Sequence, residues 1–248
     1  MKLQGKVAIV TGARQGIGEA ATTALAREGA AVVMISRSIN QTSPVVEKVK
    51  QIGGRYMIMS TDVGNRAQVQ QMVDQTIDTF GRVDVLFNNA GISKPAMLWK
   101  MPAEQWDEVI RINLTGTFNC LQAVAKPMIE QKWGSIINVT SSAGLMGTIG
   151  QVNYTAAKGG VYALTKSAAK ELARYGVRVN TVAPMAETEM TKTIAHDPKF
   201  KDKYLERIPL GRFAQPEEIA PMIVFLAADD SAYVTGQTIC IDGGMVML

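Results

Sequence analysis

The stretch TGARQGIG, from Thr11 to Gly18, joins a short apolar run to an alanine-rich segment with helical spacing. In a strand–turn–helix of this kind, Gly12 permits the tight turn, Gly16 lets the backbone approach a pyrophosphate, and Gly18 lets the helix pack close to the sheet. The helix N-terminus adds free N–H groups and the positive end of a dipole, both of which favour phosphate. The loop therefore predicts a dinucleotide site that also includes Arg14, Gln15 and Ile17, with a plain turn as the alternative.

Outward from this loop, strand-length apolar runs alternate with helical patterns along the whole chain. Runs such as Val7–Val10 and Val83–Phe87 are apolar throughout, which is typical of parallel strands that are buried on both faces. The expected strands are Lys6–Thr11, Ala31–Ser36, Tyr56–Ser60, Val83–Phe87, Ser135–Thr140, Val177–Ala183 and Gln237–Ile241. The main expected helices are Ile17–Glu28, Pro44–Ile52, Ala67–Phe80, Glu104–Gln131, Val152–Tyr175 and Glu217–Ala228.

This alternation predicts an α/β fold, a Rossmann-type doubly wound parallel sheet of about seven strands with helices on both faces. No linker or repeat divides the chain, so we expect a single catalytic domain over residues 1–248. One long irregular segment, about residues 185–209, is expected to form a lid over the substrate, because long loops in compact domains are usually functional.

Composition excludes several classes of protein. Lys and Arg number 26 against 22 Asp and Glu, for a net charge of +4, and no dense basic run marks a nucleic-acid partner. No stretch approaches the roughly 18 apolar residues that a membrane span needs, and no leader precedes the first strand, so a cytoplasmic protein without a membrane partner is expected. The two cysteines, Cys120 and Cys240, are too few for a metal cluster, and no metal site is expected.

Four further motifs follow the glycine loop, whose spacing is G-x-x-x-G-x-G. Asn88-Asn89-Ala90-Gly91 follows the fourth expected strand, Asn113 lies in the long helix, Ser141 follows the fifth strand, and Tyr154 and Lys158 lie four residues apart in the next helix. Together these motifs resemble the short-chain dehydrogenase/reductase family over essentially the whole chain. The resemblance implies an NAD(P)-dependent oxidoreductase acting on a small carbonyl substrate or a secondary alcohol.

The resemblance also implies residue roles. Its catalytic positions are Asn113, Ser141, Tyr154 and Lys158, and Asn113 supports a water that relays protons through Lys158. Its cofactor-binding positions, beyond the glycine loop, are Ser36, Arg37, Asp62, Val63, Asn89, Ala90, Gly91, Tyr154, Lys158, Pro184 and Thr188. Asp62 and Val63 match the place where the family contacts the adenine ring.

Ketone reduction explains the catalytic residue types, because the oxygen must receive a proton while the carbon receives hydride. A free tyrosine has a pKa of about 10. Nearby positive charge on Lys158 and on the oxidised nicotinamide is expected to lower the pKa of Tyr154 toward the operating pH, where acid–base catalysis is most efficient. Ser141 is expected to donate a hydrogen bond to the substrate oxygen.

A second tyrosine–lysine pair, Tyr162 and Lys166, has the same spacing. Tyr162 lies eight residues further along the helix than Tyr154, about 12 Å along the axis, and so further from the strand ends where ligands bind. The family's serine precedes its tyrosine by thirteen residues, which selects Ser141 with Tyr154. Ser142 is the nearest alternative to Ser141.

The second expected strand ends Ile35-Ser36-Arg37-Ser38, without the acid that would hold the ribose hydroxyls of NAD. A guanidinium suits the geometry of a phosphate, and Arg14 adds a second positive charge in the loop. The sequence therefore favours NADP(H) over NAD(H), with a merely solvated Arg37 as the alternative.

Within the family, the chain looks most like the 3-oxoacyl-acyl-carrier-protein reductases, so a 3-oxoacyl thioester is the expected substrate. Free small ketones, keto-sugars or cyclic alcohols are the alternative, and a non-catalytic dinucleotide-binding protein is a remote one. Where the family has Pro-Gly-x-x-x-Thr, this chain has Pro184-Met185-Ala186-Glu187-Thr188, which puts the usual carboxamide contact of Thr188 in doubt.

Partners are also implied by the resemblance. Lys132 and Tyr175, beside Arg174, stand where such reductases carry arginines near the active-site mouth that dock an acyl carrier protein, so that partner is doubtful. A homo-oligomer, specifically a tetramer, is expected because the family pairs its long helices across a two-fold axis. Small residues of the helix Val152–Tyr175, such as Ala156, Gly160 and Ala163, would allow that approach.

Overall fold

The computed structural model describes residues 1–247 and is built on one sheet of seven parallel strands. The spatial order is β3-β2-β1-β4-β5-β6-β7, and every neighbouring pair is parallel. The strands are β1 (Val7–Thr11), β2 (Ala31–Ile35), β3 (Tyr56–Met59), β4 (Val85–Asn88), β5 (Gly134–Val139), β6 (Val177–Pro184) and β7 (Thr238–Ile241). The predicted fold class is confirmed, and each expected strand is found within two residues of its predicted limits.

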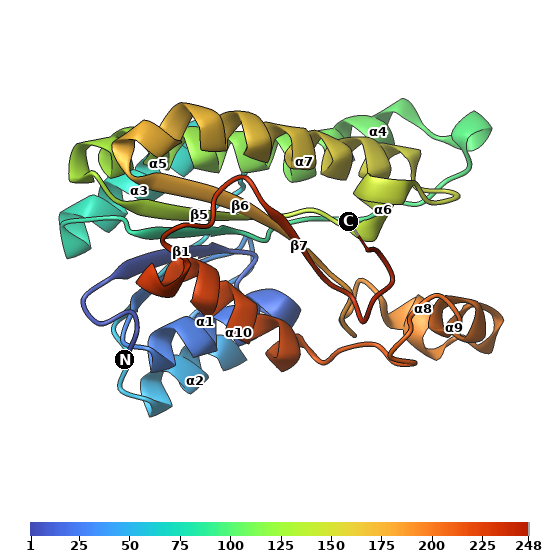
Figure 1. Cartoon of the computed structure of the whole chain (residues 1–248), viewed down its shortest axis with the longest axis horizontal. Coiled ribbons are helices and arrows are strands. Elements are labelled where there is room, and N and C mark those ends of the chain that lie inside the picture. Colours follow the sequence, from blue (N-terminus) through green and yellow to red (C-terminus); the bar gives the residue numbers. More distant parts are fainter. Residues whose placement is uncertain (248) are drawn as a thin grey trace.

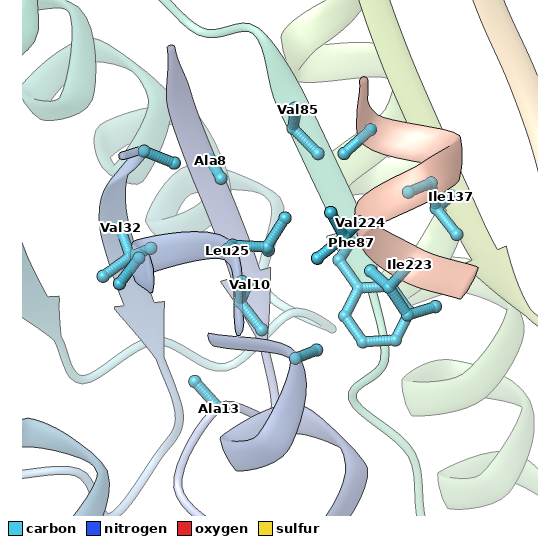
Figure 2. Close-up of a cluster of buried hydrophobic side chains, with 14 of the residues drawn as sticks. Ala8, Val10, Ala13, Leu25, Val32, Val85, Phe87, Ile137, Ile223 and Val224 are labelled. Carbon is cyan, nitrogen blue, oxygen red and sulfur yellow. The ribbon is translucent and has the colours of Figure 1, made fainter. Parts of the chain in front are cut away.

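Helices cover both faces of the sheet (Figure 1). On one face lie α1 (Gly16–Arg27), α2 (Pro44–Gln51) and α10 (Pro216–Ala227), and on the other lie α3 (Arg66–Phe80), α4 (Ala103–Ile110), α5 (Gly116–Gln131) and α7 (Val152–Leu172). Each layer buries its own apolar cluster against the strands. Figure 2 shows part of the first cluster, in which Val10 and Phe87 of the sheet meet Leu25 and Ile223 of the helices. Burial from both sides explains why strands such as β1 are apolar at every position.

The long helix expected over Glu104–Gln131 is wrong as a single element. The chain forms α4, then a π-helical turn, Arg111–Thr115, and then α5. The Asn113 side chain fixes this turn, because it exchanges hydrogen bonds with the backbone N–H and C=O of Ile92, both at 2.8 Å. The prediction also missed α6 (Ser142–Met146), and the irregular segment 185–209 contains α8 (Lys192–His196) and α9 (Pro198–Leu205).

The strand order places the functional loops at one edge of the sheet. The chain builds outward from β1 to β3 and then returns to place β4 on the other side of β1, so the connections diverge between β1 and β4. Ligands of such sheets bind outside the carboxyl ends of the strands at this point. The glycine loop, Asn89, Ser141 and Pro184 all lie at or just past the carboxyl end of a strand.

Candidate active site

The glycine loop between β1 and α1 leaves no room for side chains. A Cβ on Gly18 would lie 2.1 Å from the carbonyl oxygen of Gly12, and one on Gly12 would lie 2.9 Å from Nδ2 of Asn89. Gly12 and Gly16 also have positive φ angles, +67° and +59°, which other residues rarely adopt. The roles expected for these glycines, a tight turn and a close helix–strand approach, match this geometry.

The loop after β4 is tied to the glycine loop. Nδ2 of Asn89 donates to the carbonyl oxygens of Thr11 and Gly12 at 3.1 and 3.2 Å, and Oγ1 of Thr11 accepts from the backbone N–H groups of Asn89 and Ala90 at 3.0 Å. Sequence reasoning missed Thr11 because a threonine at a strand end carries no signal of its own. The Asn89 amide thus joins two loops that follow neighbouring strands but lie 77 residues apart in the sequence.

Three of the four expected catalytic residues meet at the carboxyl ends of β5 and β6. Ser141 caps the N-terminus of α6, its Oγ accepts from the N–H of Ala143 at 3.2 Å, and it lines the same cavity as Tyr154 in the first turn of α7. Lys158 lies one turn further along α7, and its Nζ donates to the carbonyl oxygen of Val139 at 2.7 Å. The Lys158 Nζ lies 5.8 Å from the centroid of the Tyr154 ring.

Burial sets the acid–base character of this cluster. It raises the pKa of Tyr154, and the hydrogen bond with Ser141 opposes that rise. It lowers the pKa of Lys158 to about 8. The expectation that Lys158 lowers the pKa of Tyr154 is therefore wrong for the chain by itself, because desolvation of the phenolate dominates and the ammonium is held by the Val139 carbonyl.

Asn113 lies behind the catalytic cluster rather than on the cavity wall. Its side chain is fully buried and both ends of its amide are bonded to Ile92. A Cβ on Gly91 would lie 3.2 Å from Oδ1 of Asn113 and 3.8 Å from Nζ of Lys158, so a side chain there would press on Asn113. A water relay through Asn113 and Lys158 remains a prediction.

One cavity of about 510 Å³ connects the glycine loop with the catalytic cluster. The predicted site residues on its wall are Gly12, Arg14, Gln15, Gly16, Ile17, Ser36, Arg37, Asp62, Val63, Asn89, Ala90, Gly91, Ser141, Tyr154, Lys158, Pro184 and Thr188. Gly18 and Asn113 do not line it. Lid residues complete the wall, and sequence reasoning did not single out Ile194, Tyr204 or Arg207, which lie in or beside two short helices it had read as irregular.

The second tyrosine–lysine pair has a different environment. Nζ of Lys166 donates to the hydroxyl of Tyr162 on the exposed side of α7, and neither residue lines the cavity. Ser142 lines the cavity next to Ser141, but it is Ser141 that acts on Tyr154 by opposing the rise of its pKa. The geometry thus favours Tyr154 over Tyr162 and Ser141 over Ser142.

Comparison with known proteins identifies the family. A family profile described as enoyl-(acyl carrier protein) reductase matches residues 12–246. The 3-oxoacyl-[acyl-carrier-protein] reductase FabG of Thermotoga maritima is 47% identical over 100% of both chains, and the corresponding reductase of Synechocystis is 48% identical over 99% of this chain and 98% of its own. The crystal structures of gox2181 and of levodione reductase superpose with TM-scores of 0.95 and 0.93, at 37% and 35% identity, over 98% of this chain and 96% and 98% of theirs.

The chain belongs to the short-chain dehydrogenase/reductase family. It is an NAD(P)-dependent oxidoreductase that acts on carbonyl or secondary alcohol groups, and it is most like a 3-oxoacyl-acyl-carrier-protein reductase among the functions considered. The alternative of a non-catalytic binding protein is therefore set aside. Among the described residues, no helix is long and apolar enough to cross a membrane and no cluster of His, Cys, Asp and Glu could hold a metal ion.

At the start of the lid this chain has Met185 where the family has a glycine. The methionine side chain packs inside the lid, and the backbone still brings Thr188 to the cavity. Met185 has no positive φ, so its backbone does not require the family's glycine, and its side chain is buried with Ala195, Ile208 and Phe213. Thr188 still lines the cavity, and a Cβ on Gly16 would lie 3.3 Å from its methyl carbon. The altered lid start has therefore not drawn Thr188 away from the glycine loop.

The two carrier-docking positions do not lie at the cavity of their own chain, and the docking of an acyl carrier protein stays a prediction. Lys132 ends α5 just before β5, and Tyr175 lies just before β6, so both lie at the amino ends of the strands. They adjoin each other, because a Cβ on Gly176 would lie 2.5 Å from the carbonyl oxygen of Lys132. Tyr154 lies at the opposite end of the strands, near their carboxyl ends.

Proposed function

We propose that this chain reduces the 3-oxo group of acyl thioesters to a 3-hydroxy group with NADPH. The observation that carries the proposal is one cavity whose wall brings Ser141, Tyr154 and Lys158 together with the glycine loop and Arg37. The residues fit a dinucleotide, because the loop has space only for backbone at Gly12 and Gly18 and lies at the N-terminus of α1.

When bound, NADPH supplies the hydride that adds to the carbonyl carbon. Tyr154 donates its proton to the carbonyl oxygen, and its raised pKa keeps it protonated at neutral pH. Ser141 orients that oxygen through its hydroxyl. Lys158, with a pKa of about 8, replaces the proton lost by Tyr154, and Asn113 supports the solvent path to it.

The choice of NADPH over NADH rests on Arg37. Its exposed guanidinium lines the cavity just past β2, where a dinucleotide's adenosine ribose is bound, and no acid precedes it in the strand. It makes no ion pair within the described residues. Arg14 and Ser36 line the same part of the cavity and add a charge and a hydroxyl for a phosphate.

Reduction of a free ketone is the second candidate, and a specific observation favours it. The levodione reductase structure matches this chain closely, with 35% identity, and its name describes reduction of levodione. The lid side of the cavity here includes the apolar residues Met190 and Ile194 with Tyr204, which accept apolar groups of several shapes.

A substrate panel separates these functions. Acetoacetyl-CoA, the same acyl group on an acyl carrier protein, a free cyclic ketone and crotonyl-CoA are each assayed with NADPH and with NADH. We expect the two acetoacetyl thioesters to give the highest kcat/KM, and NADPH to be preferred. A free ketone that exceeds both thioesters would replace the proposal with the second candidate, and turnover of crotonyl-CoA alone would overturn carbonyl reduction.

We propose further that residues 1–248 work as one catalytic domain, with residues 185–209 as its lid, in a cytoplasmic homotetramer. The support for assembly is an exposed strip on α7 that includes Ala156 and Ala163, and Phe118 of α5, a helix of the same layer, is 38% exposed. Docking of an acyl carrier protein stays doubtful, because Lys132 and Tyr175 stand at the two positions where such reductases carry arginines.

A further inference from the structure

Five charged side chains gather at the adenosine end of the cavity. Asp62 is ion-paired with Arg111, with 2.9 Å between Oδ2 and Nη1, and Glu108 is ion-paired with Lys94. Arg37 is the fifth, and its charge helps to lower the pKa of both carboxyls although it pairs with neither. The cluster thus holds three cations and two acids. Each acid is paired with one of the other two cations, so Arg37 has no ion-pair partner in the cluster.

Arg111 reaches Asp62 from outside the cavity. It is the first residue of the π-helical turn Arg111–Thr115 and does not line the cavity, whereas Asp62 does. A Cβ on Gly64 would lie 2.1 Å from Nη1 of Arg111, so the glycine opens the path for the guanidinium. Asp62 also accepts from the N–H of Gly64 at 2.8 Å, which fixes its second oxygen.

We propose that Arg111 is a positioning residue for cofactor selection, which acts by occupying Asp62 and so leaves Arg37 free for the 2′-phosphate of NADPH. Without Arg111, Asp62 would present an unneutralised charge to the phosphate and would attract Arg37 to itself. The inference deepens the proposed function and rests on its choice of NADPH. NADH lacks the 2′-phosphate, so its binding is expected to depend little on Arg111.

The test is direct binding, followed by the fluorescence of the reduced nicotinamide. For Arg111→Gln we expect the Kd of NADPH to rise about tenfold and that of NADH by less than about threefold, as a single charge interaction at a partly exposed site allows. Arg111→Lys retains the positive charge and should retain most of the preference. Adding Asp62→Asn to Arg111→Gln should restore the ratio of the two Kd values, because no carboxylate is left to neutralise.

Arg66→Gln is the matched control. Like Arg111, Arg66 bonds a side chain of another element and does not line the cavity, but its partner Gln122 does not line the cavity either, whereas Asp62 does. Arg66→Gln should leave the ratio unchanged. Arg111 is 42% exposed, so its replacement by glutamine is compatible with folding.

The outcomes are distinct. A ratio that Arg111→Gln leaves unchanged, or that the added Asp62→Asn fails to restore, overturns the role of Arg111. Wild-type protein that binds NADH as tightly as NADPH overturns the proposed cofactor instead.

Discussion

At the scale of single residues, Tyr154 and Tyr162 show how position in the fold decides between identical patterns. Each is followed by a lysine four residues later, but only Tyr154 lies in the first turn of α7 and lines the same cavity as Ser141. Tyr162 instead accepts a hydrogen bond from Lys166 on the exposed side of the helix.

Replacing Tyr154 by Phe removes the proton donor without changing the shape of the side chain. We expect kcat to fall by about 10²–10⁴-fold, the range typical of losing a general acid, while the Kd of NADPH stays nearly unchanged. Steady-state kinetics and cofactor fluorescence measure the two. Tyr162→Phe is the control and should retain most activity, and the reverse pattern would show that the wrong pair has been assigned.

Lys158 makes the stability of the cofactor-free chain depend on pH in an unusual direction. Burial lowers its pKa from 10.5 to about 8, so between these values the unfolded chain binds a proton that the folded chain does not. Stability should therefore rise with pH across this window, by about 3 kcal/mol in total. The raised pKa of Tyr154 acts oppositely, but only above pH 10, where the unfolded tyrosine ionises first.

Urea unfolding of wild type and Lys158→Met at intervals from pH 7 to pH 10 measures this effect. Subtracting the free energy of unfolding of Lys158→Met from that of wild type removes the contribution of groups that titrate alike in both proteins. We expect that difference to shift in favour of wild type as the pH rises through about 8. A difference that stays constant with pH would contradict a buried lysine of lowered pKa.

Single residues also mark the limit of what the sequence predicts about the site. The glycines, Ser141, Tyr154 and Lys158 were predictable because each belongs to a local motif on a recognisable element. The partnership of Arg111 with Asp62 was not, because 49 residues separate them and an arginine within a helical pattern resembles a solvated surface residue. Only the packing of α4 and the π-helical turn near the end of β3 brings the two charges together.

At the scale of elements, the strands were predictable and the helix break at Arg111–Thr115 was not. A strand that is covered by helices on both faces must be apolar at nearly every position, and such runs can be recognised in the sequence. The π-helical turn is flanked by ordinary helical backbone, with φ and ψ of −61° and −47° at Ile110. The hydrophobic periodicity of the sequence does not predict this turn, because a tertiary contact causes it. The Asn113 side chain turns inward and bonds the backbone of Ile92.

The lid has a small apolar cluster of its own, and Met185 connects it to β6. Met185→Ala removes side-chain contacts with Ile208 and Phe213. Such a truncation costs about 2–5 kcal/mol in a rigid core, and here we expect most of the loss in local opening of the lid. Hydrogen exchange of residues 192–205 should accelerate, and the KM for substrate should rise.

Leu210→Ala is the control for this prediction. Leu210 is 72% exposed and does not line the cavity, so its truncation should leave exchange in the lid helices unchanged. Unaltered exchange in Met185→Ala would mean that the lid is held by its hydrogen bonds, such as that from Thr188 N–H to Thr191 Oγ1 at 2.8 Å, and not by this cluster.

At the scale of the whole molecule, only part of the small residues of α7 is exposed and can take part in assembly. Most small residues of α7 serve contacts within the chain: Ala157, Ala168 and Ala169 are buried, and a Cβ on Gly160 would lie 2.9 Å from Leu114. Ala156 and Ala163 are the exposed ones, seven residues apart and so on one face of the helix. We also expect the apolar C-terminal residues 245–248 to favour assembly; of these, Val246 is buried within the chain, Met247 is 81% exposed, and Leu248 lies outside the described residues.

The strip around Ala156 and Ala163 is where a second copy of this chain would approach α7, because small side chains let two helices come close and a self-complementary patch closes on a two-fold axis. Ala163→Glu places a charge in the middle of this strip without touching the cavity. We expect wild type to sediment as a tetramer at micromolar concentration and Ala163→Glu to sediment as smaller species. Ala67→Glu, on the exposed start of α3, should sediment as wild type does. Wild type that sediments as one species near 26.8 kDa would contradict the assembly and leave the exposed alanines of α7 without a role.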